Sequence, residues 1–232
     1  MNSLPDPFHA LVIGASGGIG AAFVAALQAD PRCAAVTALH RRSQPPIDLL
    51  DDPSIAAAAA DLAAQGLRFQ LILVATGVLH GEGFQPEKRL AEVALGSLEA
   101  VFRINTFGPA LVLRHFTPLL DRQHGVLAVL SAKVGSIEDN RLGGWYAYRA
   151  SKAALNMLLK TAAIELRRTH PGAVLAALHP GTVRSALSRP FKGDQIGQDP
   201  AAACAGMLAA LDGLSPEDSG CFVAYNGARL PW

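Results

Sequence analysis

Short apolar runs alternate with longer segments of helical periodicity along most of the chain. The runs of strand length occupy residues 9–13, 34–39, 69–75, 126–130, 173–178 and 221–225, with a possible further short strand at 47–49. The helical patterns occupy residues 21–29, 54–65, about 97–120, the stretch around 148 that runs to about 169, and 200–211. Alternating strands and helices predict a parallel sheet joined by right-handed crossovers. We therefore expect one α/β domain over residues 1–232, with a doubly wound Rossmann-type sheet of about seven strands and helices on both faces.

A glycine-rich turn follows the first strand. Glycines at 14, 18 and 20 let the backbone turn tightly and approach a pyrophosphate, and free N–H groups at the start of the next helix would meet its charge. We expect a dinucleotide site over this turn, comprising Gly14, Ser16, Gly18, Ile19 and Gly20. A purely structural turn is the alternative, because the spacing is GxxxGxG and not GxGxxG.

The end of the second strand carries His40, Arg41 and Arg42, and no acidic residue occurs between Asp30 and Asp48. A dinucleotide fold that prefers NAD places a carboxylate there, whereas guanidinium groups suit a 2′-phosphate. The sequence therefore favours NADP(H), with NAD(H) possible and a solvated basic loop as the alternative. Further along the chain, Asp48 and Leu49 are expected near the adenine, and Ser54 is a plausible N-cap of the next helix.

Two features of the middle of the chain indicate the same site. Small residues, Ala75-Thr76-Gly77, end the buried run 69–75 and leave room for a cofactor. Pro109 cannot donate a hydrogen bond to the main-chain carbonyl of Asn105, four residues earlier in the long helical pattern. That carbonyl needs another partner, either water or a lysine at the site, although a structural kink alone would also explain the proline.

Tyr148 and Lys152 are four residues apart, which places them on one helix face. That face continues with apolar residues, so the lysine is aimed inward; the residues are Leu155, Leu159, Ala162 and Leu166. A buried ammonium is costly unless paired, and beside a phenol it would lower the tyrosine pKa from its ordinary value of about 10. The pair therefore predicts a general acid/base, and the alternative is a lysine that reaches solvent from the helix edge.

The composition excludes several classes of protein. The formal charge of +1 gives no attraction to nucleic acid or anionic membranes, and no basic stripe replaces it. The 3 cysteines are widely spaced and form no CxxC or Cys/His cluster, so we expect no disulfide framework and no metal site. Residues 1–8 lack the features of a signal peptide, and no long apolar run occurs. We expect a soluble, cytoplasmic protein without nucleic-acid or membrane partners.

The ordered set Gly14-x-x-x-Gly18-Ile19-Gly20, Asn105, Tyr148-x-x-x-Lys152 and Pro180-Gly181-x-Val183 resembles the short-chain dehydrogenase/reductase family over essentially the whole chain. The tracts 131–137 and 143–152 look more narrowly like the C-factor and sniffer-type carbonyl reductase branch. The resemblance implies that Tyr148 exchanges a proton with a carbonyl or alcohol oxygen. It also implies that Lys152 holds the nicotinamide ribose, that Asn105 fixes a water in a proton relay, and that Pro180, Gly181 and Val183 contact the nicotinamide.

Two departures from the family pattern concern polar side chains. The family usually has a substrate-orienting serine second in a Ser-Ser pair, and this chain has Ser131-Ala132 there. Because neighbouring strand residues alternate, Ser131 should point to the other face, and Ser136 is the more plausible replacement. The second departure is Ala75-Thr76-Gly77 in place of the common Asn-Ala-Gly, which removes a structural asparagine contact.

The leading hypothesis is an NADP(H)-dependent oxidoreductase that interconverts a small carbonyl compound and its alcohol. The alternative is an NAD(P)-binding signalling or regulatory protein of C-factor type with weak or no catalysis, which Ala132 suggests; a nucleoside-sugar epimerase-like protein is a third idea. Residues 185–198 combine proline, glycine and apolar residues and are expected to cover the substrate. By resemblance we also expect a homodimer or homotetramer.

Overall fold

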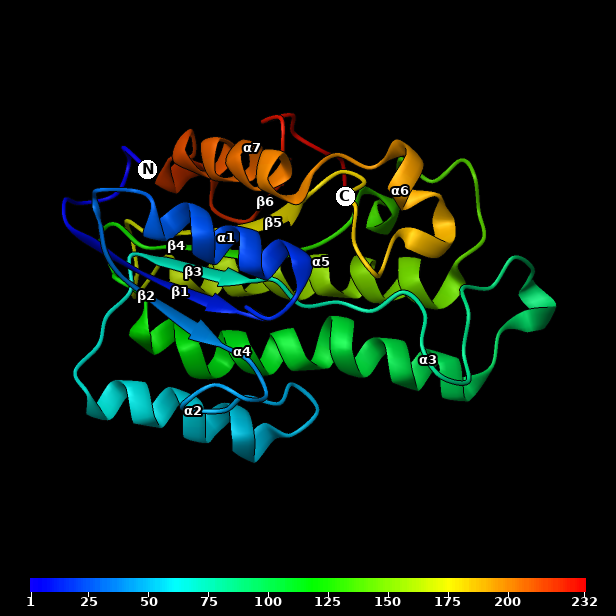
Figure 1. Cartoon of the computed structure of the whole chain (residues 1–232), viewed down its shortest axis with the longest axis horizontal. Helices are drawn as coiled ribbons and strands as arrows, with labels where there is room; N and C mark the ends of the chain where they lie inside the picture. Colours follow the sequence, from blue (N-terminus) through cyan, green and yellow to red (C-terminus); the bar gives the residue numbers. More distant parts are fainter.

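Six parallel strands form one sheet in the order β2-β1-β3-β4-β5-β6 (Figure 1). The structure, a computed structural model, describes all residues from 1 to 232. The strands are β1 (Phe8–Ile13), β2 (Cys33–Leu39), β3 (Leu71–Val74), β4 (Val126–Leu130), β5 (Val174–His179) and β6 (Cys221–Ala224). The strand order reverses between β1 and β3, so the sheet is doubly wound, with its ligand crevice expected at the carboxyl ends of these strands.

The central strands are apolar on both faces, as the continuous runs predict. Every residue of β3 and β4 is buried, because helices cover both sides of the sheet. Helices α1 (Gly18–Gln28) and α7 (Pro200–Asp212) pack on one face, where Phe23 and Met207 are fully buried. Helices α2 (Asp52–Ala64), α4 (Gly108–Phe116) and α5 (Tyr146–Leu166) pack on the other, as Figure 1 shows.

The long helical pattern around 97–120 is divided in the structure. Helix α3 (Leu95–Phe102) leads into a π-helical turn, η2 (Arg103–Phe107), before α4 and the short η3 (Thr117–Leu119). The N–H of Gly108 donates to the carbonyl of Arg103, five residues earlier. Because Pro109 has no N–H to donate to Asn105, the regular hydrogen-bond ladder is broken at this position, and the wider turn accommodates the break.

Two expectations about residues 47–54 are wrong. Residues 47–49 form no strand, so the sheet has six strands and not about seven. The N-cap of α2 is Asp51, not Ser54. The hydroxyl of Ser54 accepts a hydrogen bond of 3.0 Å from the N–H of Asp48 instead, because the helix begins two residues before it.

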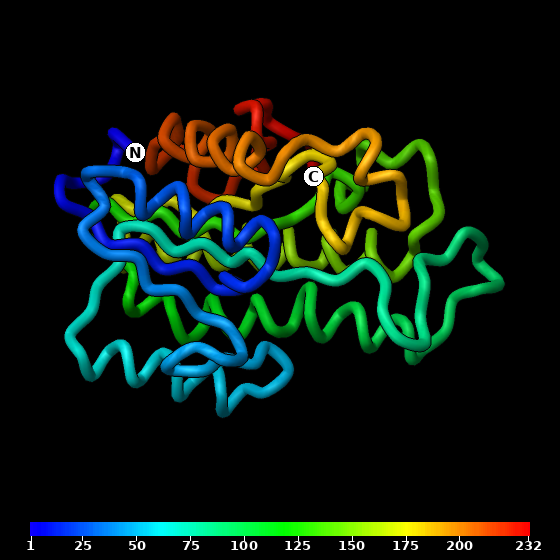
Figure 2. Tube along the Cα trace, in the orientation of Figure 1, coloured from blue at the N-terminus to red at the C-terminus, as the bar shows by residue number.

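The connections at the carboxyl ends of the strands are the longest in the molecule. They contain η1 (Leu90–Glu92), η4 (Lys133–Gly135), η5 (Arg189–Phe191) and α6 (Gly193–Ile196), whereas η6 (Pro216–Asp218) lies before β6. Figure 2 shows the segments 80–94, 137–145 and 185–198 together at this end of the molecule. The expected cover at 185–198 is thus partly helical. None of the helices combines the length and the apolar character that crossing a membrane requires.

Candidate active site

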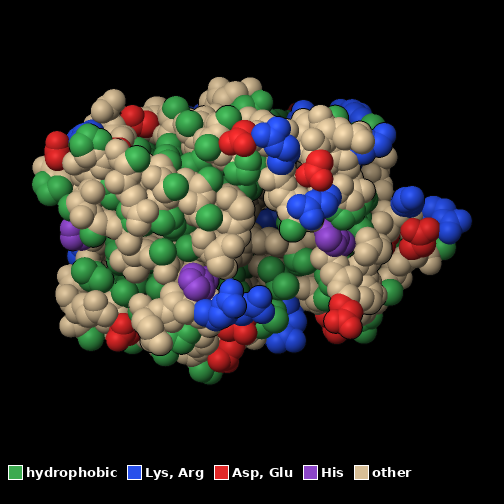
Figure 3. Space-filling view, in the orientation of Figure 1, with side chains coloured by type: hydrophobic (Ala, Val, Ile, Leu, Met, Phe, Trp, Pro, Cys, Tyr) green, Lys and Arg blue, Asp and Glu red, His purple; other side chains and the backbone are tan.

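Three adjoining recesses form a groove along the carboxyl ends of the strands. The first has a volume of about 330 Å³ and the second about 390 Å³, and they share Gly17 and the Ala75–Gly77 turn. The second and third recesses share Leu79, Tyr148 and Leu187 among others. Figure 3 shows a hollow on one face of the molecule, with lysine, arginine and histidine side chains around it. The groove is therefore continuous from the end of β2 to the start of α5.

The glycine-rich turn brings the start of α1 against the end of β1. Gly14 has a φ of 88°, and a Cβ on Gly20 would lie 2.1 Å from the carbonyl oxygen of Gly14. Any side chain at position 20 would therefore force α1 away from the turn. No side chain caps α1 at Gly17, so its first N–H groups are available to an anion. The first recess is lined by Gly14, Ser16 and Gly17, and the second by Gly17, Gly18 and Ile19.

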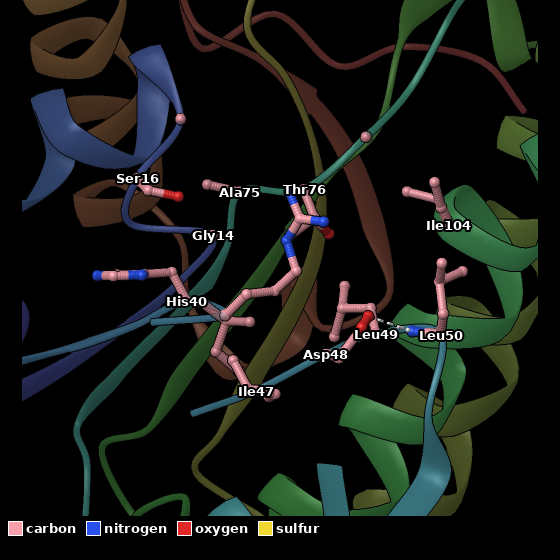
Figure 4. A pocket seen from close by; sticks show the side chains of 14 residues that line it. Gly14, Ser16, His40, Ile47, Asp48, Leu49, Leu50, Ala75, Thr76 and Ile104 are labelled. Carbon is pink, nitrogen blue, oxygen red and sulfur yellow. Dashed lines mark hydrogen bonds between the residues drawn. The ribbon is translucent and has the colours of Figure 1, made fainter. Parts of the chain in front are cut away.

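The first recess lies between this turn and the end of β2. Figure 4 shows Ser16 and Ile104 on opposite sides of it. His40 and Arg41 line it, whereas Arg42 is exposed outside it and donates its N–H to the Nδ1 of His40 over 3.1 Å. Two of the three residues expected near the cofactor's ribose thus line the first recess.

Asp48 supplies the one carboxylate in the lining of the first recess. Its Oδ1 accepts a hydrogen bond of 3.0 Å from the N–H of Leu50, the dashed line in Figure 4. That bond stabilises the turn at 48–50, and Leu49 beside it also lines the recess. The carboxylate is thus engaged by its own loop, and no acidic residue stands at the end of β2 itself.

The turn after β3 connects the first two recesses. Thr76 has a buried Oγ1 with no hydrogen-bond partner in the protein, and it lines both recesses. At Gly77, a Cβ would lie 3.5 Å from Oδ1 of Asn105 and 3.6 Å from Nζ of Lys152. An unpartnered hydroxyl in a crevice kept open by small residues fits the backbone of a dinucleotide, which has polar groups to offer at close range.

Tyr148 and Lys152 line the second recess from the first two turns of α5, at 9 % and 2 % exposure. The Nζ of Lys152 donates a hydrogen bond of 2.8 Å to the carbonyl of Leu130 at the end of β4, and it lies 6.0 Å from the centre of the Tyr148 ring. The predicted inward pair is therefore present. The lysine does not reach solvent from the helix edge, since the carbonyl of Leu130 holds it inside.

Burial sets the protonation of this pair in an unexpected direction. It raises the pKa of Tyr148 to about 12 and lowers the pKa of Lys152 to about 7, because both charged forms lose hydration. The expectation that the ammonium lowers the tyrosine pKa is therefore wrong for the protein alone. At neutral pH Tyr148 is a phenol that holds its proton.

Asn105 is fully buried behind the pair, and its side chain has a structural role. Its Oδ1 accepts from the N–H of Val78 over 2.8 Å, and its Nδ2 donates to the carbonyl of Val78 over 2.8 Å and to the hydroxyl of Ser151 over 3.1 Å. The carboxamide thus joins the β3 loop to α5. If Asn105 contacts a water in a proton relay, it does so through its main-chain carbonyl, because Pro109 leaves that carbonyl without its usual helical donor.

Comparison with known proteins agrees with this geometry. A family model described as short chain dehydrogenase matches residues 8–195, which include every residue described so far at the groove. The chain is a short-chain dehydrogenase/reductase. The matched range includes the glycine-rich turn, the Asn105 turn and the Tyr148–Lys152 pair, which are motifs on which the resemblance to the family is based.

Relatives of this short-chain dehydrogenase/reductase have different activities in their names. A 1-hydroxy-2-glutathionyl-2-methyl-3-butene dehydrogenase of Rhodococcus sp. is 32% identical over 82% of this chain and 80% of its own. The C-signal protein of Myxococcus xanthus is 39% identical over 62% of this chain and 83% of its own. Among solved structures, the NADPH-bound carbonyl reductase from chicken fatty liver has 27% identity and a TM-score of 0.83, covering 98% of this chain and 100% of that one. Sniffer of D. melanogaster has 21% identity, the same TM-score and the same coverage, which shows the shared fold.

The serines of this short-chain dehydrogenase/reductase lie apart from the expected arrangement. The buried hydroxyl of Ser131 donates to Oδ1 of Asn156 over 2.6 Å, on α5. Ser136 donates to the carbonyl of Trp232 over 3.1 Å, accepts from the N–H of Asp139 over 3.0 Å, and lines none of the three recesses. The structure therefore does not support Ser136 as a replacement for the family's serine. Ala132 packs against Tyr148 at that position.

The third recess extends from Tyr148 towards residues 179–196 and is mainly apolar. Pro180, Gly181 and Val183 line it as expected, and Gly181 has a φ of 75°. Burial lowers the pKa of His179 to about 4, and its Nδ1 accepts from the N–H of Lys133 over 3.2 Å, so this histidine is neutral.

Of the aromatic residues around Tyr148, the sequence indicated Phe191, in the segment 185–198, but not Trp145 or His80. Trp145 lies 6.2 Å from the Tyr148 ring and 5.2 Å from the Phe191 ring, and His80 lies 5.8 Å from Phe191. Trp145 and Phe191 line the third recess, and His80 lines the second. The only early signal for Trp145 was its position three residues before Tyr148.

Proposed function

We propose that this protein is an NADP(H)-dependent oxidoreductase that interconverts an apolar carbonyl compound and its alcohol, with Tyr148 as the general acid/base. The observation that supports it most is the continuity of the groove. The glycine-rich turn opens into the first two recesses, Thr76 and Gly77 join them, and Tyr148 and Lys152 line the second. One extended dinucleotide lying in this groove would bring its reactive ring to the phenol.

The residues along the groove fit the parts of this cofactor. The free N–H groups at Gly18 and Ile19 suit the pyrophosphate, Lys152 suits the ribose beside the nicotinamide, and Pro180–Val183 suit the ring itself. When bound, the nicotinamide exchanges a hydride with the substrate carbon. Residues Asp48 and Leu49 are suited to the adenine end.

The preference for the phosphorylated cofactor rests on the end of β2. Arg41 and His40 line the first recess and form no ion pair, and the nearest carboxylate, Asp48, accepts a hydrogen bond from its own loop. A free guanidinium suits a 2′-phosphate. The carbonyl reductase from chicken fatty liver, which shares the fold and 27% of the sequence, has NADPH bound.

The protonation of the pair favours reduction of a carbonyl. With a pKa of about 12, Tyr148 is the proton donor that the developing alkoxide needs at neutral pH. Lys152, with a pKa of about 7, can return a proton towards the phenol, and the main-chain carbonyl of Asn105 can hold the water that refills it. Oxidation of an alcohol requires the phenolate and is therefore expected only at higher pH.

The third recess indicates the kind of substrate. Leu79, Ala132, Leu187 and Phe191 give it apolar walls around Tyr148, and Ser131, which also lines it, donates its hydroxyl hydrogen to Asn156. Such a pocket binds the apolar substituent of a ketone or aldehyde and leaves recognition of its oxygen to Tyr148.

Assembly into a homodimer or homotetramer is also part of the proposal. The outer surfaces of η2 and α5 expose large apolar side chains, namely Phe107, Met157, Leu158 and Ile164. Exposed apolar residues gathered on neighbouring helices are typical of an interface between subunits.

A second candidate is a cofactor-binding signalling protein with weak catalysis. It is favoured by the 39% identity to the C-signal protein and by Ala132 at the position of the family's serine. The two candidates differ in turnover, because both bind the dinucleotide.

The test is consumption of NADPH and NADH by the purified protein with a panel of apolar aldehydes and ketones. We expect reduction of several of them, with kcat/KM for NADPH at least roughly tenfold above that for NADH, as expected for one charge-assisted contact. Tight binding of NADPH with no turnover on any of these compounds would contradict the enzyme proposal and favour the signalling protein.

A further inference from the structure

The three residues before the active-site helix have an unusual backbone. Gly143, Gly144 and Trp145 have φ values of 64°, 65° and 53°. Glycine adopts this left-handed conformation freely, but for a bulky aromatic residue it is an outlier that persists only where the surroundings enforce it. Trp145 is also the N-cap of α5, so its conformation sets the direction in which the helix and Tyr148 begin.

Glu87, in the loop after β3, enforces that conformation from one side. Its main-chain carbonyl accepts from the N–H of Trp145 over 2.5 Å, and its carboxylate Oε2 accepts from the N–H of Ala147 over 3.1 Å. Figure 2 shows the two segments side by side at this end of the molecule, although 60 residues separate Glu87 from Ala147. Glu87 thus holds the main chain at Trp145 and again two residues later, in the first turn of α5.

Arg149 enforces the turn from the other side. Its guanidinium donates to the carbonyl of Gly143 over 3.0 Å, to that of Gly144 over 2.9 Å and to that of Val134 over 3.1 Å. The carbonyls of the left-handed turn are therefore satisfied by a side chain one helical turn later. Glu87 and Arg149 together leave the turn little freedom, so the indole has a defined position.

Burying the Glu87 carboxylate costs free energy unless hydrogen bonds or a nearby positive charge compensate it. The residue is 3 % exposed, and its second oxygen, Oε1, is buried without a hydrogen-bond partner. A buried carboxylate needs compensation, and here the free N–H groups and the positive end of α5 provide it. No other side chain caps this helix.

The indole that is held in this way forms a wall of the third recess. It meets Tyr148 edge-on at an interplanar angle of 76° and Phe191 at 63°. Ala132 lies on the same recess where the family has a serine, and the lining beside the indole is apolar, with Leu79, Leu187 and Phe191. Selection therefore depends on the shape of the apolar wall.

We propose that Trp145 determines substrate specificity by packing against the apolar group attached to the carbonyl carbon, and that Glu87 is the residue that positions it. This inference rests on the proposed reduction of carbonyl compounds. We therefore expect the substrates to be carbonyl compounds with an aryl or similarly broad apolar substituent, because such a group would fill the space beside the indole and the Phe191 ring.

Two diketones that differ only in this group provide the kinetic probe: 2,3-butanedione and 1-phenyl-1,2-propanedione. We expect W145A and E87A each to lower the ratio of kcat/KM for the phenyl compound to that for the methyl compound by roughly tenfold, mainly through KM. E87Q should keep the wild-type ratio, since the glutamine Oε1 still accepts from Ala147. E82Q, at an exposed glutamate of the same connection, is the matched control and should keep it too.

The double variant separates positioning from general damage. If Glu87 acts through Trp145, E87A in the W145A background changes the ratio no further. Two results would overturn the positioning of Trp145 by Glu87. One is an equal loss of kcat/KM for both diketones in E87A, and the other is a ratio that falls again by the same factor in the double variant. An unchanged ratio in W145A would overturn the specificity role.

Two measurements need no turnover and so separate this inference from the proposed reaction. In a W232F background, Trp145 is the one tryptophan that remains of the two. E87A should then shift the Trp145 fluorescence emission to longer wavelength and increase its quenching by acrylamide. E87Q should change neither. Calorimetry with the NADP⁺ complex should show binding of the phenyl diketone weakened roughly tenfold by W145A. Unchanged fluorescence in E87A and unchanged binding in W145A would reject the inference even if no reduction occurred.

Discussion

Asn105 and Ser151 are joined by a hydrogen bond of 3.1 Å from carboxamide to hydroxyl, although 46 residues separate them. Ser151 lies on α5 directly before Lys152, and Asn105 lies in the π-helical turn that Pro109 causes. The same carboxamide makes two hydrogen bonds to the main chain of Val78. One buried side chain therefore fixes the loop after β3, the π-helical turn and the active-site helix relative to one another.

Replacing Asn105 by alanine should destabilise the protein by about 2–4 kcal/mol, because three hydrogen bonds are lost and the half-buried main-chain groups of Val78 lose their partners. Urea unfolding measures this. S151A, which removes a single hydroxyl from the same network, is the matched control and should cost about 1 kcal/mol. Equal stability of the two variants would show that Asn105 does not hold the network together.

Arg41 should determine cofactor preference. R41A is expected to raise the Kd for NADPH roughly 10- to 100-fold, because a charge-assisted contact with the 2′-phosphate is lost. The Kd for NADH, which lacks this phosphate, should change little. R42A is the control, because Arg42 lies outside the first recess. The two dissociation constants can be measured by fluorescence of the reduced nicotinamide. If R42A had the larger effect, the assignment of the phosphate site to Arg41 would be wrong.

Gly20 is the position where the groove tolerates a side chain least. In G20A the new Cβ would lie 2.1 Å from the Gly14 carbonyl oxygen, so α1 must shift and its N–H groups with it. We expect NADPH binding at least about tenfold weaker and a loss of stability of about 1–3 kcal/mol. G96A adds the same methyl group to α3, where no atom lies within 4 Å, and should be neutral or stabilising by about 1 kcal/mol. Normal NADPH affinity in G20A would argue against the phosphate site.

His179 should make part of the stability depend on pH. Its folded-state pKa is lowered to about 4 from an ordinary value of 6.5, so the unfolded chain binds more protons between these values. Stability is therefore lost as the pH falls from 6.5 to 4, by on the order of 3 kcal/mol from this group. H179N keeps an acceptor for the N–H of Lys133 but does not titrate. Denaturation midpoints across this range should fall less steeply for H179N than for the wild type, and parallel curves would contradict the assignment.

The sequence predicts the order of the elements well because their periodicity is strong and local. The runs that become β3 and β4 are apolar throughout, and the turn at Gly14–Gly20 follows a strand and precedes a helix, as a dinucleotide site requires. The break at Pro109 was also visible, since a missing N–H is a property of the residue itself.

The remaining features depend on neighbours that are distant in sequence. Ser136 was favoured by its position before Tyr148, yet its hydroxyl is engaged by Trp232 at 3.1 Å, 96 residues away. Glu87 lies in a loop without periodicity, and only the folded chain brings its carboxylate to α5. The direction of the Tyr148 pKa shift also depends on the fold, because burial removes the hydration of the phenolate and so raises the pKa.

The most direct test of the whole account is the turnover of Y148F, measured together with its affinity for NADPH. Removing the one hydroxyl should lower kcat for carbonyl reduction by about a thousandfold, the size of a general-acid contribution, while the Kd for NADPH stays within about twofold because the ring remains in place. Reduction by Y148F at a rate near that of the wild type would contradict the central claim that the buried phenol supplies the proton.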